Sequence, residues 1–207
     1  MIPMLIKTLP VGQLETNCYI VTNEETLDCV VIDPGDESNT ILDYIEDNHL
    51  ACKAVFLTHG HFDHTGACEA VSEETGAPVY MPEADDAANI KSRHFLYTLP
   101  ENGKYYCGGE TVSAAGMEFE IIATPGHTPG GVSIRSGNVL FTGDTLFRGS
   151  CGRTDLDGGD PAALSESLAK LCALDGDYEV YPGHMDSTSL IREKNFNYYC
   201  RKAMQNK

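Results

Sequence analysis

The stretch Thr58-His59-Gly60-His61-Phe62-Asp63-His64-Thr65-Gly66 carries the strongest signal in this sequence. It directly follows the apolar run 54–57, which predicts a short buried strand. In an extended segment, residues two apart point the same way, so His59 and His61 can bind one metal ion together. Asp63 and His64 suit a second ion beside the first. Histidine nitrogen and carboxylate oxygen are ligands that suit zinc or, failing zinc, iron or manganese.

Three later apolar runs also end in a possible metal ligand. They are 119–123 before His127, 138–141 before Asp144, and 178–181 before His184. Strand ends place such side chains at the edge of a sheet, and the small residues before each one allow a sharp turn. A carboxylate such as Asp144 has two oxygens and can bridge two ions about 3.5 Å apart. A solvated turn is the alternative for each run alone, but together with the stretch 58–66 the runs predict a site for two ions.

The length of the chain and its 42% hydrophobic content predict one compact α/β domain over residues 1–207, without a separate C-terminal substrate domain. Strands are expected at 4–9, 18–22, 27–32, 54–57, 78–81, 110–115, 117–123, 131–135, 138–142 and 178–181. Helices are expected from 38 to about 49, from 64 to 75, near 84–96, from 160 onward and from 188 to 204. His49 is expected to cap a helix end or to lie on the surface, and His94 is expected to be structural.

Charge and hydropathy exclude several classes of partner. The formal charge of −17, with 31 acidic against 14 basic side chains, disfavours nucleic acid, which requires clustered Lys and Arg. The first residues do not resemble a signal peptide, and no apolar run is long enough to cross a membrane. Eight cysteines without a C-x-x-C pair are expected to be reduced, so the sequence predicts a soluble cytoplasmic protein, either monomer or homodimer.

The stretch 58–66, followed in order by His127, Asp144 and His184, resembles the metallo-β-lactamase superfamily. The resemblance covers nearly the whole chain, from Gly12 and Asn17 through Asp33-Pro34-Gly35 to the final expected helix. It implies a four-layer αββα sandwich with a dinuclear metal site at one edge of the sheets. It also implies two sets of ligands. The implied ligands are His59, His61 and His127 on the first metal, Asp63, His64 and His184 on the second, and Asp144 bridging both.

A metal site of this kind predicts hydrolysis. A metal-bound water has its pKa lowered towards 7, so hydroxide is available as the nucleophile at neutral pH, with Asp63 and Asp144 as the catalytic side chains. Within the superfamily, the segments 143–147 and 152–160 are similar to short bacterial glyoxalase II thioesterases. That resemblance implies that Arg153 contacts a small acyl-thiol substrate such as S-lactoylglutathione. The alternative is that Arg153 pairs with an aspartate of its own loop.

Other functions remain open at the level of sequence. Longer glyoxalase II enzymes carry a C-terminal helical domain that grips glutathione, whereas only 23 residues follow His184 here, so another thiol is an alternative. A persulfide dioxygenase with a single iron and a lactonase are rival activities. β-Lactam hydrolysis is disfavoured because those enzymes usually lack an aspartate at the position of Asp144. A non-enzymatic metal-binding domain is the last alternative, and it is disfavoured because structural zinc sites are usually built from cysteines.

Overall fold

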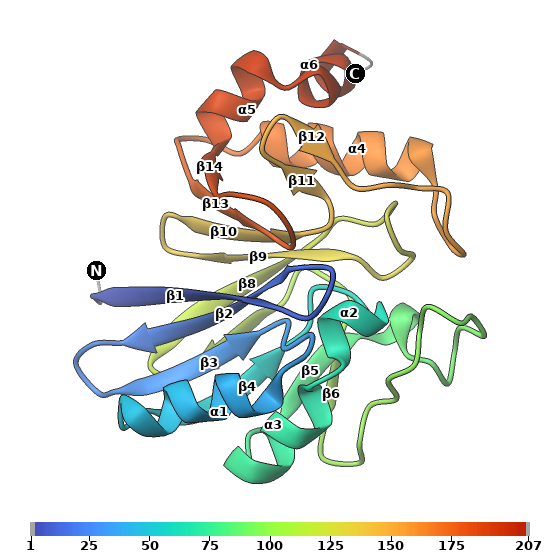
Figure 1. Cartoon of the computed structure of the whole chain (residues 1–207). Helices are drawn as coiled ribbons and strands as arrows, with labels where there is room; N and C mark the ends of the chain where they lie inside the picture. Colours follow the sequence, from blue (N-terminus) through green and yellow to red (C-terminus); the bar gives the residue numbers. More distant parts are fainter. Residues whose placement is uncertain (1–2, 206–207) are drawn as a thin grey trace.

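Two six-stranded sheets stacked face to face form the centre of the molecule (Figure 1). The computed structural model describes residues 3–205. The first sheet has the order β1 (Met4–Val11), β2 (Thr16–Asn23), β3 (Asp28–Ile32), β4 (Ala51–Phe56), β5 (Val79–Pro82) and β6 (Lys104–Tyr106). The second has the order β14 (Thr188–Ser189), β13 (Glu179–Pro182), β10 (Val139–Gly143), β9 (Val132–Ser136), β8 (Met117–Ala123) and β7 (Thr111–Ala114).

Helices cover the outer face of each sheet (Figure 1). Next to the first sheet lie α1 (Ser38–Asp47) and α3 (Cys68–Thr75), which connect the parallel strands β3, β4 and β5. Next to the second sheet lie α4 (Pro161–Cys172), α5 (Leu190–Phe196) and α6 (Tyr198–Gln205). Parallel neighbours need such crossover helices, whereas β1, β2 and β3 are antiparallel and are joined by short turns. The αββα sandwich expected from the sequence is therefore confirmed.

The alternation of side chains along the strands explains why both sheets are buried on two faces. Along β2, Tyr19 and Val21 point into the core between the sheets, while Cys18 and Ile20 point towards the helices α1 and α3. Aromatic rings fill the space between the sheets, and the ring centroids of Phe56 and Phe119 lie 5.1 Å apart. A strand covered on both sides reads as a continuous apolar run, which is the pattern of residues 18–21.

Several expected elements differ in the structure. The helix expected over 64–75 is divided into α2 (Phe62–Thr65) and α3, because the N–H of Ala67 donates to the carbonyl oxygen of Pro34 at 2.9 Å instead of to the preceding helical turn. Beside it, a Cβ on Gly66 would lie 2.4 Å from the carbonyl oxygen of Gly35, so this junction packs directly on the loop after β3. The helix expected near 84–96 is one 3₁₀ turn, η1 (Glu83–Asp85), followed by a loop that bridges to His61 through Phe95. The last expected helix begins later and is interrupted at Asn197, whose side-chain oxygen accepts the N–H of Tyr199 at 2.9 Å.

The loops that carry the candidate ligands all meet at one edge of the sandwich. They follow β4, β8, β10 and β13, and the last two strands are parallel neighbours. A small third sheet lies beside this edge and consists of β11 (Leu146–Phe147) and β12 (Ser150–Cys151) (Figure 1). Within residues 3–205, none of the helices has the length and apolar character required to span a membrane.

Candidate metal centre

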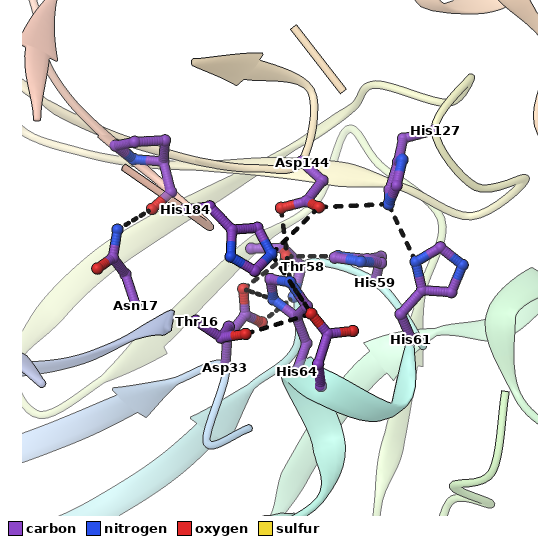
Figure 2. A network of polar contacts seen from close by, with 12 residues as sticks. Thr16, Asn17, Asp33, Thr58, His59, His61, His64, His127, Asp144 and His184 are labelled. Carbon is purple, nitrogen blue, oxygen red and sulfur yellow. Dashed lines mark hydrogen bonds and ion pairs between the residues drawn. The ribbon is translucent and has the colours of Figure 1, made fainter. Parts of the chain in front are cut away.

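All seven side chains that the sequence singled out as ligands converge at this edge. Figure 2 labels each of them except Asp63. His59 follows β4, His61 is the N-cap residue of α2, and Asp63 and His64 lie in the first turn of that helix. The others follow the strands of the second sheet. They are His127 after β8, Asp144 after β10 and His184 after β13.

Six of the seven side chains form two groups of three. The ligand atoms of His59, His61 and His127 lie within 4.8 Å of one another, and Nε2 of His127 is 3.0 Å from Nδ1 of His61. The ligand atoms of Asp63, His64 and His184 also lie within 4.8 Å of one another. Each group therefore has three donor atoms close enough to surround one metal ion, which is the number that catalytic sites usually supply.

Asp144 lies between the two groups. Its Oδ2 is 3.4 Å from Nε2 of His127 and 3.5 Å from Nε2 of His184, and its Oδ1 is 3.5 Å from Nε2 of His64. One carboxylate thus contacts a histidine of each group, which is the placement that a bridging ligand requires. Close packing protects this position, since a Cβ on Gly183 would lie 2.3 Å from Oδ1 of Asp144.

The buried polar atoms of the site fit a metal better than they fit a hydrogen-bonded core. Among the described residues, Nε2 of His59, Nε2 of His64 and Oδ1 of Asp144 are buried without a hydrogen-bond partner. Buried polar atoms in proteins are normally paired, so a cluster of such atoms indicates a missing ligand. Imidazole nitrogens and carboxylate oxygens are suitable donors for zinc and other divalent metals, so the residues present fit the ions that the sequence predicted.

Electrostatics also favour cations here. Burial, reinforced by the neighbouring imidazoles, lowers the pKa of His61 to about 3 and that of His59 well below its usual value. These two rings are therefore neutral and keep a lone pair for a metal. Burial alone would also lower the pKa of His64, but the carboxylates of Asp144 and Asp33 outweigh it and raise that pKa to about 9. The carboxylates thus favour positive charge at this point, which a proton or a metal ion can supply.

Asp33 orients His64 and was not predicted to be part of the site. Its Oδ2 lies 3.0 Å from Nδ1 of His64 and accepts the Thr58 hydroxyl at 2.6 Å, while its Oδ1 accepts the backbone N–H of Thr58 at 2.7 Å. Such partners fix the ring so that the other nitrogen faces the metal. In the sequence, the segment Asp33-Pro34-Gly35 is the feature that could have indicated this role. Its glycine is required where the segment packs on the ligand loop, since a Cβ on Gly35 would lie 1.7 Å from the carbonyl oxygen of Asp63.

Asp85 joins the loops that carry the first group, and nothing in the sequence pattern indicated this role. Its carboxylate is fully buried, with Oδ2 accepting the N–H of Gly60 at 3.1 Å and Oδ1 accepting that of Gly130 at 2.6 Å. Gly60 lies between His59 and His61, and Gly130 lies three residues after His127. One carboxylate therefore holds together both loops of the group.

Backbone carbonyls orient the remaining histidines. Nδ1 of His127 donates to the carbonyl oxygen of Arg153 at 2.8 Å, and Nδ1 of His184 donates to that of Leu14 at 3.1 Å. In both rings this leaves Nε2 facing Asp144. On β2, Asn17 donates to the carbonyl oxygens of Pro182 and Met185 at 3.0 and 2.9 Å and so holds the loop of His184.

A cavity of about 580 Å³ opens above the two groups. It is lined by Leu14, His61, Phe62, Asp63, His94, His127, Asp144, Phe147, Ser150, Cys151, Arg153, Leu156, His184 and Met185. His94, expected to be structural, therefore also forms part of the cavity wall, and its carbonyl oxygen accepts the N–H of Phe62 at 2.9 Å. Arg153 lies on the wall and also pairs with Asp155, with two N–O distances of 2.7 Å.

Comparison with known proteins supports the assignment of the fold. Hydroxyacylglutathione hydrolase GloC of Haemophilus influenzae is 32% identical over 212 residues, which cover 94% of this chain and 97% of that protein. The crystal structure of BLEG-1 B3 metallo-β-lactamase has a TM-score of 0.84 and 31% identity, and it covers 95% of this chain and 99% of its own. The crystal structure of TTHA1623 in a di-iron-bound form has a TM-score of 0.80 and 36% identity, covering 93% and 99%.

The family model described as the metallo-beta-lactamase superfamily matches residues 11–184, a range that includes every ligand candidate from His59 to His184. The same range includes Asp33 and Asp85, which orient the candidate ligands. Fold, sequence match and the two groups of donor atoms agree, and the chain belongs to the metallo-β-lactamase superfamily of metallo-hydrolases.

Proposed function

We propose that this protein is a metal-dependent thioesterase of the glyoxalase II type, which hydrolyses a hydroxyacyl-thiol such as S-lactoylglutathione. One observation carries the proposal: two groups of three donor side chains share Asp144 at the base of a cavity of about 580 Å³. The name of the relative GloC supports the choice of thioester, because that protein is a hydroxyacylglutathione hydrolase. The eight free thiols of the chain suit a reducing compartment, so we also propose a cytoplasmic location.

In this proposal each group of side chains holds one divalent ion. His59, His61 and His127 would hold the first, Asp63, His64 and His184 would hold the second, and Asp144, which lies against a histidine of each group, would be shared. We assign zinc because the donors are nitrogen and oxygen, and iron is the alternative because TTHA1623 is di-iron-bound. When bound, such ions supply a water whose pKa is near 7 and polarise the carbonyl under attack.

The side chains around the ions perform the remaining tasks. Burial raises the pKa of Asp63, but hydrogen bonding to His184 and the charge of His64 outweigh it and lower that pKa below its usual value. Asp63 is therefore a carboxylate at neutral pH and accepts the Thr16 hydroxyl at 3.2 Å, which fixes its orientation. A carboxylate so placed can accept a proton from the attacking water. The leaving thiolate, with a parent pKa near 8.5, departs without a dedicated general acid.

The cavity separates the two ends of such a substrate. Asp63, Asp144 and His184 lie at its base, where the scissile carbonyl must reach the ions. Phe62 and Phe147 provide apolar wall for the chain between carbonyl and thiol. We assign to Arg153 the contact with a carboxylate of the thiol, because Arg153 is one of the residues that line the cavity and its guanidinium has the fork geometry that binds carboxylates, as its pairing with Asp155 illustrates.

A substrate panel tests the proposal. Zinc-loaded protein is assayed with S-lactoylglutathione, a neutral acyl thioester, a lactone and a β-lactam. We expect the highest kcat/KM for a thioester, and preferential hydrolysis of the β-lactam would overturn the assignment. The variant Asp144→Ala should lose at least about 100-fold in kcat while its circular dichroism spectrum stays unchanged. Undiminished thioester hydrolysis by Asp144→Ala would show that the proposed dinuclear site is not the catalyst.

A further inference from the structure

The hairpin of β11 and β12 forms one wall of the cavity and belongs to neither main sheet. Its strands pair only through Leu146 with Cys151 and Phe147 with Ser150. Phe147, Ser150 and Cys151 line the cavity, and the ring of Phe147 lies edge-on to His184 at a centroid distance of 6.2 Å. A hairpin with two residue pairs is not stable alone, so other groups must hold it in place.

Two side chains bind the backbone of this hairpin, that of Glu193 on α5 and that of Asn197 at the junction of α5 and α6. Oε2 of Glu193 accepts the N–H of Gly149 at 2.7 Å. Nδ2 of Asn197 lies 2.9 Å from the carbonyl oxygen of Ser150 and 3.3 Å from that of Phe147, and it also donates to Oε2 of Glu193 at 2.9 Å. The turn of the hairpin has a φ of +74° at Gly149. Its N–H group is thus bound by Glu193, and its carbonyl groups are bound by Asn197.

Glu193 and Asn197 are both 0% exposed, which requires an explanation for a carboxylate. A buried charge is costly unless it is fully hydrogen-bonded. Glu193 meets this condition, because the Thr188 hydroxyl donates to its Oε1 at 2.7 Å and the Arg192 guanidinium pairs with the same oxygen. The helices also dock through apolar contacts, since α5 and α6 bury Leu190, Cys200 and Ala203 against the core formed with α4. What the polar groups add is contact with the hairpin.

The far end of the hairpin is fixed by different contacts. A Cβ on Gly152 would lie 1.8 Å from the carbonyl oxygen of Asp144, so the chain after β12 is packed directly against the ligand loop. The next residue, Arg153, accepts the hydrogen bond from His127. The candidate ligands therefore keep their own supports, and loss of the helix contacts should displace the wall around Phe147 rather than the metal site.

We propose that Glu193 and Asn197 are positioning residues that set the substrate-facing wall of the cavity by holding the turn of the β11–β12 hairpin. The expected effect on substrate affinity rests on the proposed function, since the wall is expected to contact the acyl-thiol. In this arrangement the C-terminal helices control affinity for substrate without contacting substrate or metal.

Three variants test the proposal, Asn197→Ala, Glu193→Ala and the conservative Glu193→Gln. Asn23→Ala is the matched control, because Asn23 is also a buried amide that donates to a backbone carbonyl, that of Ala115 at 3.0 Å, at the opposite end of β2 from Asn17. For each protein, KM and kcat with S-lactoylglutathione, bound metal per chain, and amide hydrogen exchange of residues 146–151 are measured on the full chain.

Asn197→Ala and Glu193→Ala should raise KM about tenfold and change kcat less than about threefold, with unchanged metal content. Hydrogen exchange of 146–151 should accelerate, whereas exchange of 59–64 should not. Glu193→Gln should fall between wild type and Glu193→Ala, since it keeps one acceptor oxygen, and it keeps the test valid if the alanine variant does not fold. Asn23→Ala should leave KM and exchange of 146–151 unchanged.

Wild-type exchange of 146–151 in Asn197→Ala would overturn the proposal, and so would loss of metal in proportion to activity. An equal rise of KM in Asn23→Ala would also overturn it, because the effect would then follow from general destabilisation. Absence of thioester hydrolysis by the wild type would instead contradict the proposed function. In that case the exchange measurement still decides whether the two residues hold the hairpin.

Discussion

Oδ2 of Asp33 lies 3.0 Å from Nδ1 of His64, and both side chains are buried. The contact determines which nitrogen of His64 faces the site, because Nδ1 is engaged and Nε2 is left 3.6 Å from Oδ2 of Asp63 and 3.5 Å from Oδ1 of Asp144. Asp33 also binds the residue before His59, so one carboxylate is shared by the supports of both groups. The ligand set therefore depends on a residue that does not itself line the cavity.

Asp33→Asn should weaken metal binding by about 10- to 100-fold, the usual effect of removing the partner of a ligating histidine. The physical reason is that a neutral amide binds the His64 ring more weakly than a carboxylate does. Competition with a chromophoric zinc chelator measures the affinity. Asp28→Asn is the control, because Asp28 is the first residue of β3, the strand that Asp33 directly follows, and it pairs with Lys53 at 3.1 Å. Equal zinc affinities for the two variants would contradict the role given to Asp33.

Asp85→Asn should lower the affinity for the ion assigned to His59, His61 and His127 by about tenfold, since an amide nitrogen would face a backbone N–H of Gly60 or Gly130. A stepwise metal titration monitored by calorimetry separates the affinity for this ion from the affinity for the second. Asp86→Asn is a close control, because Asp86 is equally buried but binds Leu99 and Tyr105 instead. A comparable loss of affinity in Asp86→Asn would show that the effect does not depend on the hydrogen bonds from Gly60 and Gly130 to Asp85.

Arg153→Ala should raise KM for S-lactoylglutathione about tenfold and leave metal content unchanged, because a charged hydrogen bond to the substrate is lost. A thioester of a neutral thiol should be hydrolysed equally well by wild type and variant. Arg135→Ala serves as the comparison, since Arg135 pairs with Glu120 and does not line the cavity. If Arg153→Ala affected both thioesters alike, the guanidinium would only brace its own loop through Asp155.

The buried carboxylate of Glu193 should make stability depend on pH. Burial raises its pKa, but hydrogen bonds from Thr188, Gly149 and Asn197 outweigh this and lower the pKa below its usual value. The unfolded chain therefore binds the proton more readily, and Glu193 contributes stability that is present above its ordinary pKa, about 4.3, and is lost as the pH falls through the lower folded value.

Urea unfolding of metal-free wild type and Glu193→Gln between pH 7 and pH 3 measures this contribution. The difference in free energy of unfolding should be constant near neutral pH and should shrink below about pH 4.5. Both proteins carry the same histidines, so their titration cancels in the difference. A difference that grew as the pH fell would contradict the sign of the pKa shift.

The convergence of the candidate ligands and the sandwich fold could be predicted because their signals are local. An apolar run followed by a small residue and a histidine or aspartate marks a strand end, and strand ends meet at one edge of a sheet. The alternation of side chains also predicted most strands. That residues 1–207 form one domain stays a prediction.

The supports of the site could not be predicted, because they join segments far apart in the sequence. Asp85 binds Gly60 and Gly130, which are 25 and 45 residues away, and no periodic pattern encodes such contacts. The helix breaks at Gly66 and Asn197 follow from tertiary packing in the same way. His94 lies on the cavity wall because the loop after η1 packs against α2, where the N–H of Phe62 donates to the carbonyl oxygen of His94. The sequence pattern of this loop is weak, so its position could not be predicted.

The sequence predicts the substrate of the protein less directly than it predicts the metal ligands. The cavity wall is assembled from several loops, among them those of Leu14, His94 and Met185. A short motif can specify ligands on one strand end, but the shape of such a wall depends on how all these loops pack together. The chain is similar both to GloC, named as a hydroxyacylglutathione hydrolase, and to BLEG-1, named as a metallo-β-lactamase. Proteins of similar sequence and fold are thus named after different reactions.

The rate of S-lactoylglutathione hydrolysis against equivalents of zinc added to chelator-treated protein tests the central claim most directly. The two groups of ligands that share Asp144 predict a rate that rises until two ions are bound per chain and then stays constant. Full activity at one ion per chain would contradict the dinuclear site. No hydrolysis at any loading, with one iron per chain and oxygen uptake on glutathione persulfide, would contradict the thioesterase.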